Sequence, residues 1–175
     1  DIAVVGDFDP AQVTALMQEH FGDWTSAKAY ERIPMPLVLA PTVVQMLETP
    51  DKANAVIIQS GQFPLSDSHP DYAALLVANN IFGSGGMTSR LGDRVRQKDG
   101  LSYSIGSGIS ADSSRDGKDD AGSFSIQAIA APQNAARLEA AIREELARFV
   151  KDGITDAELK DAVSGLLTNR EQTRA

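Results

Sequence analysis

The hydrophobic period of this chain changes abruptly between a short basic helix and a strand. Leu91 and Val95 are four residues apart and share one face of a helix. Gly100 suits the left-handed position just after that helix. From Leu101, apolar residues alternate with Ser and Gly, as in a strand with one buried face. A charged helix and a half-buried strand therefore meet within one turn of chain.

Three glycines, Gly83, Gly85 and Gly86, precede the basic helix. A glycine loop before a helix can hold a phosphate. This loop follows a helix instead of a strand, however, and it lacks the Gly-Lys-Ser/Thr ending of a P-loop. We therefore interpret it as a flexible loop or a point of close backbone approach, and expect it to be among the most mobile internal segments.

The rest of the chain alternates short strand patterns with amphipathic helix patterns. Asp9 and Pro10 predict a helix start, and Thr155 with Glu158 predicts a capping box for the last helix. The run at residues 55–58 is apolar on both faces, as in a central strand. We predict strands at residues 2–6, 43–48, 52–63, 101–111 and 124–130, with helices beginning near residues 10, 70, 90, 134 and 156. This order predicts an α+β domain, a largely antiparallel sheet covered by helices.

Composition restricts the possible functions. The 175 residues, 42% of them hydrophobic, suffice for one domain, and we expect residues 1–175 to form a single domain cut from a longer polypeptide. A net charge of −8 disfavours a nucleic-acid partner, and no apolar run is long enough to insert into a membrane. There is no cysteine for a disulfide or a thiolate zinc site. The acidic stretch at residues 112–121 predicts a solvated hairpin loop.

Catalytic residues do not stand out as a cluster. His20 and His69 are isolated, so neither forms a histidine pair that could hold zinc on a helix. The basic residues of the short helix, Arg94, Arg96 and Lys98, are explained simply by complementation of the helix dipole and by solubility. Tyr103, in register with Ile105 and Ile109, is explained as a core tyrosine with its hydroxyl at the rim.

Several segments together resemble a known family. They are Val4-Val-Gly-Asp-Phe-Asp-Pro10, His69-Pro-Asp71, Asn79-Asn-Ile-Phe-Gly83, Ser89-Arg-Leu91, Arg96-Gln-Lys-Asp-Gly-Leu-Ser-Tyr103 and Gly153-Ile-Thr-Asp-Ala-Glu-Leu159. In this order, over nearly the whole chain, they resemble the second-type, non-zinc-binding domain of the pitrilysin/insulinase zinc metallopeptidases. Mitochondrial processing peptidase and the cytochrome bc1 core proteins are relatives of that family.

The resemblance implies a LuxS/processing-peptidase-like fold and a place in a two-halved peptidase that encloses a chamber. Zinc would be held by another domain or subunit, and no metal or catalytic residue is expected here. Arg96 and Tyr103, seven residues apart, match the Arg and Tyr that contact peptide substrate in active members. Such donors can orient a peptide carbonyl and stabilise its oxyanion. The alternative is a structural or assembly domain, like the core proteins. The resemblance also suggests the bacterial periplasm.

Overall fold

The computed structural model describes residues 2–34, 36–113 and 119–173. They form two compact units, Asp1–Ile33 and Pro34–Ala175. In the first unit, the regular element among the described residues is helix α1 (Pro10–Phe21). Its start is as predicted, with Pro10 as the first residue and the Asp9 carboxylate accepting from the N–H of Ala11 at 2.8 Å. A short side chain before proline therefore suffices to place this helix.

The strand predicted at residues 2–6 is wrong. The described residues of this stretch have no strand partner, and Val5 is 97% exposed. An apolar run becomes a strand only when its N–H and C=O groups meet a second strand. Within the described part of the first unit no second strand exists, so the pattern alone does not produce one.

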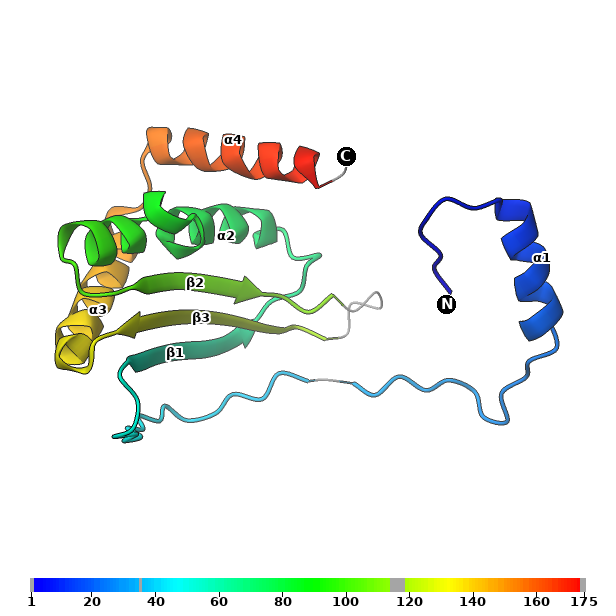
Figure 1. The fold of residues 1–175 in the computed structure, drawn as a ribbon, viewed down its shortest axis with the longest axis horizontal. Helices are drawn as coiled ribbons and strands as arrows, with labels where there is room; N and C mark the ends of the chain where they lie inside the picture. Colours follow the sequence, from blue (N-terminus) through cyan, green and yellow to red (C-terminus); the bar gives the residue numbers. More distant parts are fainter. Residues whose placement is uncertain (1, 35, 114–118, 174–175) are drawn as a thin grey trace. The chain divides into compact units, whose positions relative to one another are not determined.

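The second unit contains a three-stranded sheet of β1 (Ala55–Pro64), β2 (Ser104–Ser110) and β3 (Ala121–Ala130). The strand order is β1-β3-β2, and both pairings are antiparallel. Figure 1 shows these strands side by side with helices stacked against them. The predicted α+β fold with a largely antiparallel sheet is therefore confirmed.

Three longer helices accompany the sheet: α2 (Tyr72–Asn79), α3 (Ala135–Asp152) and α4 (Asp156–Gln172). Helix α2 contacts both β2 and α4, while α3 contacts β1. In Figure 1, α2 accordingly lies between the sheet and α4. The core between sheet and helices is formed by Phe82, Leu91, Val95, Leu101, Ile126, Ala128, Ala130, Leu138, Ala141 and Ile142. The alternation on β3 and the stripe on α3 thus face each other, as their spacing predicts.

Strand β1 differs from its prediction as a central strand. It lies at one edge of the described sheet, and Val56 and Ile58 on its outer face are 55% and 68% exposed. The run is apolar on both sides, but the helices cover only the side of Ile57. Apolar residues on both faces of a strand allow both faces to be buried, but here the described helices cover only one face of β1.

The strand predicted at residues 43–48 is also wrong. Val44 and Met46 are 86% and 87% exposed, and the backbone there has no ladder partner among the described residues. The turn that follows does form, with Lys52 N–H donating to the carbonyl of Thr49 at 2.9 Å. Local turn chemistry was therefore predicted correctly, whereas strand formation again depends on a partner.

The connection between β2 and β3 joins two antiparallel neighbours, as a hairpin requires. Residues 114–118 of the predicted acidic loop lie outside the described residues. On its described flank, Asp119 is only 2% exposed, and the carbonyl of Asp120 accepts from the N–H of Leu65 at 2.7 Å. Asp119 is therefore buried next to the chain after β1, whereas the side chain of Asp120 is exposed, as predicted for this loop. None of the helices in the described ranges is long and apolar enough to cross a membrane.

Candidate functional site

The stretch between α2 and β2 is helical in an unusual way. After α2, Asn80–Ser84 form a π-helical turn, and Gly92–Lys98 form a second one. The N–H of Gly85 reaches the carbonyl of Asn80 at 2.9 Å, and that of Asp99 reaches Arg94 at 3.0 Å, five residues back in each case. π-helical turns are rare and occur frequently at functional sites. We call residues 90–98 the basic segment.

The glycines before the basic segment serve close packing. A Cβ at Gly83 would overlap the side chain of Ser107 on β2, and one at Gly85 would lie 2.6 Å from the carbonyl oxygen of Asn80. Gly86 has a φ of +69°, which favours glycine. Close backbone approach, one of the two interpretations of this loop, therefore accounts for Gly83 and Gly85. High mobility of residues 83–86 stays a prediction.

Ser89 directly precedes the basic segment and caps its start. Its side chain is 1% exposed, donates to the carbonyl of Gly86 at 2.6 Å and accepts from the N–H of Gly92 at 3.1 Å. This is the bonding of a helix N-cap. Leu91 and Val95, both 0% exposed, then enter the core. Their four-residue spacing therefore fixes which side of the segment faces the sheet and α3.

Arg90 joins the basic segment to the start of α4. Its guanidinium donates to both carboxylate oxygens of Glu158, at 2.7 and 2.9 Å, and to the carbonyl of Gly153 at 2.7 Å. It also lies 5.0 Å from the centre of the Phe149 ring. The Glu158 carboxylate additionally accepts from the N–H of Thr155 at 2.8 Å, which completes the predicted capping box.

The Arg90 guanidinium lowers the pKa of Glu158 from its ordinary 4.5 to about 2, with help from Thr155. The same bond raises the pKa of Arg90. Both side chains are mostly shielded from water, at 18% and 29% exposure. A two-point guanidinium–carboxylate pair of this kind fixes orientation as well as charge.

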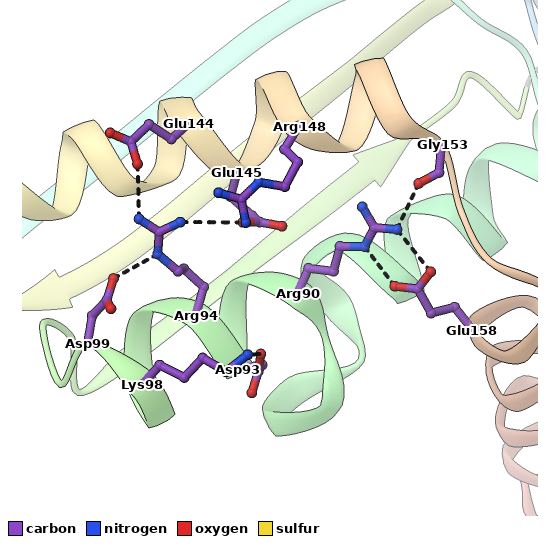
Figure 2. Close-up of polar contacts among 10 residues, drawn as sticks. All are labelled: Arg90, Asp93, Arg94, Lys98, Asp99, Glu144, Glu145, Arg148, Gly153 and Glu158. Carbon is purple, nitrogen blue, oxygen red and sulfur yellow. Dashed lines mark hydrogen bonds and ion pairs between the residues drawn. The ribbon is translucent and has the colours of Figure 1, made fainter.

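Arg94 makes a second connection, to α3. Its guanidinium donates to Asp99 at 2.8 Å and to Glu144 at 2.9 Å, and lies 3.8 Å from Glu145 (Figure 2). Glu145 is 4% exposed and also lies 3.4 Å from Arg148. These bonds raise the pKa of Arg94, first through Asp99 and then through Glu144. Complementation of the helix dipole does not explain the position of Arg94, because its guanidinium pairs with specific carboxylates.

An open cavity of about 260 Å³ lies beside these two connections. It is lined by Arg90, Asp93, Arg94, Lys98, Glu145 and Arg148. Each of its four cationic side chains already has a carboxylate partner, including Lys98 with Asp93 at 2.6 Å. The cavity therefore offers little free positive charge for an anionic ligand.

Arg96 and Tyr103 are placed differently. Arg96 is exposed, and within the described residues its guanidinium forms no hydrogen bond or ion pair. Tyr103 is 62% exposed, so its prediction as a core tyrosine beside Ile105 and Ile109 is wrong. The strand begins only at Ser104, so the alternation of buried residues does not extend back to Tyr103.

The backbone around Tyr103 is nevertheless held firmly. Its N–H donates to the carbonyl of Ile129 at 2.9 Å, and the N–H of Leu101 donates to Val95 at 2.9 Å, six residues back across Gly100. Gly100 has the expected left-handed φ of +59°. Next to Tyr103, the buried Ser102 hydroxyl lies 2.8 Å from the same Ile129 carbonyl oxygen. The Tyr103 side chain is thus exposed, while its backbone is held in place by hydrogen bonds.

Metal ligands do not gather in the part of the chain that the structure describes: no group of three or more His, Cys, Asp or Glu is placed to hold an ion. His69 serves the start of α2, where its Nδ1 accepts from the N–H of Asp71 at 3.2 Å. His20 lies in the last turn of α1. The residues described here therefore do not fit a zinc site.

The family of this chain follows from its match to a family model described as the peptidase M16 inactive domain, over residues 1–166. The chain belongs to this family. The resemblance to zinc metallopeptidases of the pitrilysin/insulinase type is thereby confirmed. For an M16 inactive domain, the absence of a zinc motif in the sequence is in keeping with the family's description.

Two curated relatives are described as uncharacterized zinc proteases. The one from Mycobacterium leprae is 29% identical over 167 residues, 94% of this chain and 36% of the relative. The one from Bacillus subtilis is 35% identical over 98 residues, 56% of this chain and 22% of the relative. The M16 inactive domain described here thus spans about a third or less of the length of these relatives.

Solved structures agree with the fold. The peptidase M16 inactive domain from Pseudomonas fluorescens matches with a TM-score of 0.61 and 27% identity, covering 69% of this chain and 27% of that one. A protease from Helicobacter pylori matches with a TM-score of 0.74 and 20% identity, covering 96% of this chain and 40% of that one. At 20% identity the second likeness shows the fold alone.

Sequence reasoning missed the Arg90 and Arg94 connections. Their partners Glu158 and Glu144 follow 68 and 50 residues later in the chain. Arg90 and Arg94 are four residues apart and so share one side of the helix, which was a usable signal for a common role. Glu158 was assigned to the capping box correctly, but nothing in its local pattern indicates a second, distant partner.

Proposed function

We propose that this chain is a substrate-contacting, non-metal-binding domain of a zinc metalloendopeptidase, and that it helps to enclose the chamber in which peptides are cleaved. The observation that carries the proposal is the pair of Arg96 and Tyr103. Both side chains are exposed donors, and the backbone that bears each is anchored to the sheet or the core. The guanidinium groups of Arg90 and Arg94 donate to carboxylates, whereas the Arg96 guanidinium has no bonding partner among the described residues.

A guanidinium and a phenol suit a peptide substrate. Each donates hydrogen bonds to a carbonyl oxygen, and the bond strengthens as negative charge develops on that oxygen. The zinc and the general base would come from another domain or subunit of the same peptidase, because the described residues do not fit a metal site. The proposed role of Arg96 and Tyr103 is therefore to bind and orient the peptide.

A structural or assembly role is the second candidate. It is favoured by apolar side chains left open on the outer face of β1 and along α4, where Leu159 and Leu167 are 42% and 57% exposed. Such residues suit a surface that other parts of a larger protein cover. In that role, Arg96 and Tyr103 would not affect turnover.

Mutation of the pair in the full-length peptidase separates the two candidates. Tyr103→Phe and Arg96→Leu should each lower kcat/KM by roughly ten- to a thousand-fold, the range for losing one oxyanion donor. The double variant should lose less than the product of the two effects, because both donors address one substrate group. Tyr30→Phe, which alters another exposed tyrosine, is the matched control. Unchanged turnover in both single variants would end the substrate-contact proposal.

A further inference from the structure

Residues on opposite sides of the basic segment have opposite environments. Arg94 and Arg96 are two residues apart, which in a helix directs their side chains to roughly opposite sides. The Arg94 side is bound to α3, whereas the Arg96 side is exposed. The position of the Arg96 guanidinium thus depends on the contacts that hold the opposite side of the basic segment.

π-helical turns are rare and occur mostly as single turns, and the basic segment is joined to α3 and α4 by tertiary contacts of its side chains. Arg90 and Arg94 supply these contacts at two points, four residues apart. Arg90 binds the junction between α3 and α4 through Gly153 and Glu158. Arg94 binds the middle of α3 through Glu144, and it binds Asp99, the residue that directly follows the basic segment (Figure 2).

We propose that Arg90 and Arg94 are positioning residues for Arg96: their two connections fix the basic segment on α3 and α4 so that the Arg96 guanidinium is held where a peptide substrate can be bound. This inference rests on the proposed function of Arg96. It assigns a role to Arg90, Arg94 and Glu158 that the helix-dipole and capping-box interpretations do not contain. These residues act through Arg96 and do not themselves touch the substrate.

The geometry indicates which substitutions are informative. Arg90→Lys keeps the charge but loses the planar fork that meets both Glu158 oxygens and the Gly153 carbonyl at once. Arg90→Gln removes the charge as well. Exchanging the partners, Arg90→Glu with Glu158→Arg, tests whether restoring an ion pair restores function. The matched control is Arg143→Gln. It breaks an exposed ion pair within α3, in which the Arg143 guanidinium lies 2.7 Å from the Glu139 carboxylate, and this pair does not involve the basic segment.

The decisive measurement is a double-mutant cycle in the full-length peptidase, at a temperature where circular dichroism shows every variant folded. In the unmodified enzyme, Arg96→Leu should lower kcat/KM at least tenfold. In the Arg90→Gln or Arg90→Lys background, the same change should cost at least threefold less, because the Arg96 guanidinium is already misplaced. The Arg143→Gln background should leave the cost of Arg96→Leu unchanged.

The outcomes separate this inference from the function on which it rests. An equal cost of Arg96→Leu in all backgrounds would overturn the positioning role while leaving the substrate contact intact. No cost of Arg96→Leu in the unmodified enzyme would overturn both. A second measurement needs no activity: amide exchange at residues 92–98 should be at least tenfold faster in Arg90→Lys than in Arg143→Gln, and equal rates would contradict the proposal.

Discussion

The two sides of the basic segment show how one short stretch can carry two kinds of residue. On the inner side, Leu91 and Val95 are fully buried, and Arg90 and Arg94 meet carboxylates of later helices. On the outer side, Arg96 is exposed and without a bonding partner among the described residues. Arg90, Arg94 and Arg96 have the same side chain. Their bonding partners differ, and this difference separates a structural role from a proposed binding role.

The buried apolar side should give the largest effect on stability. Leu91→Ala removes a side chain that is 0% exposed and leaves a cavity against the core. We expect a loss of about 2–5 kcal/mol in the free energy of unfolding, the range for such truncations in packed cores. Urea denaturation followed by circular dichroism measures it. A loss below 1 kcal/mol would show that the segment is not packed as described.

The inner ion pair should give a smaller, pH-dependent effect. Glu158→Gln keeps an acceptor for the cap but removes the charge that Arg90 binds, so we expect a loss of about 1–2 kcal/mol at pH 7 for a partly exposed pair. Because the pKa of Glu158 is lowered from 4.5 to about 2, its stabilisation is complete above pH 4.5 and is lost as the pH falls toward 2.

The difference between wild type and Glu158→Gln should therefore shrink between pH 4.5 and pH 2. Denaturation midpoints of both proteins across this range measure the difference. A constant difference down to pH 2 would mean that the Glu158 charge is not the stabilising feature. The control Glu139→Gln removes one partner of the exposed Arg143 pair and should have little effect at any pH.

The outer side should give the smallest effect on stability. Arg96→Leu removes a guanidinium that bonds to nothing in the described structure, so the free energy of unfolding should change by less than about 0.5 kcal/mol. Arg94→Leu, at the other side of the same helix, is the natural comparison. A fall in melting temperature as large for Arg96→Leu as for Arg94→Leu would remove the distinction between the two sides.

Local sequence patterns determined most of the helix boundaries in this protein. Asp9-Pro10, the Thr155–Glu158 capping box and the left-handed Gly100 each act within a few residues, so their physics can be read without a partner. The alternation on β3 likewise predicted its buried face. The spacing of Arg96 and Tyr103, by contrast, pointed to the candidate site only through the family resemblance.

Only the tertiary structure decided which strand patterns became strands and which arginines became anchors. Residues 2–6 and 43–48 read like β1, but a ladder needs a second strand, and only β1 has one among the described residues. Arg90, Arg94 and Arg96 read alike as cations of one helix. Helices α4 and α3 place Glu158 and Glu144 beside Arg90 and Arg94, whereas Arg96 stays exposed. Charges pair according to their distance in space and not according to their distance along the chain.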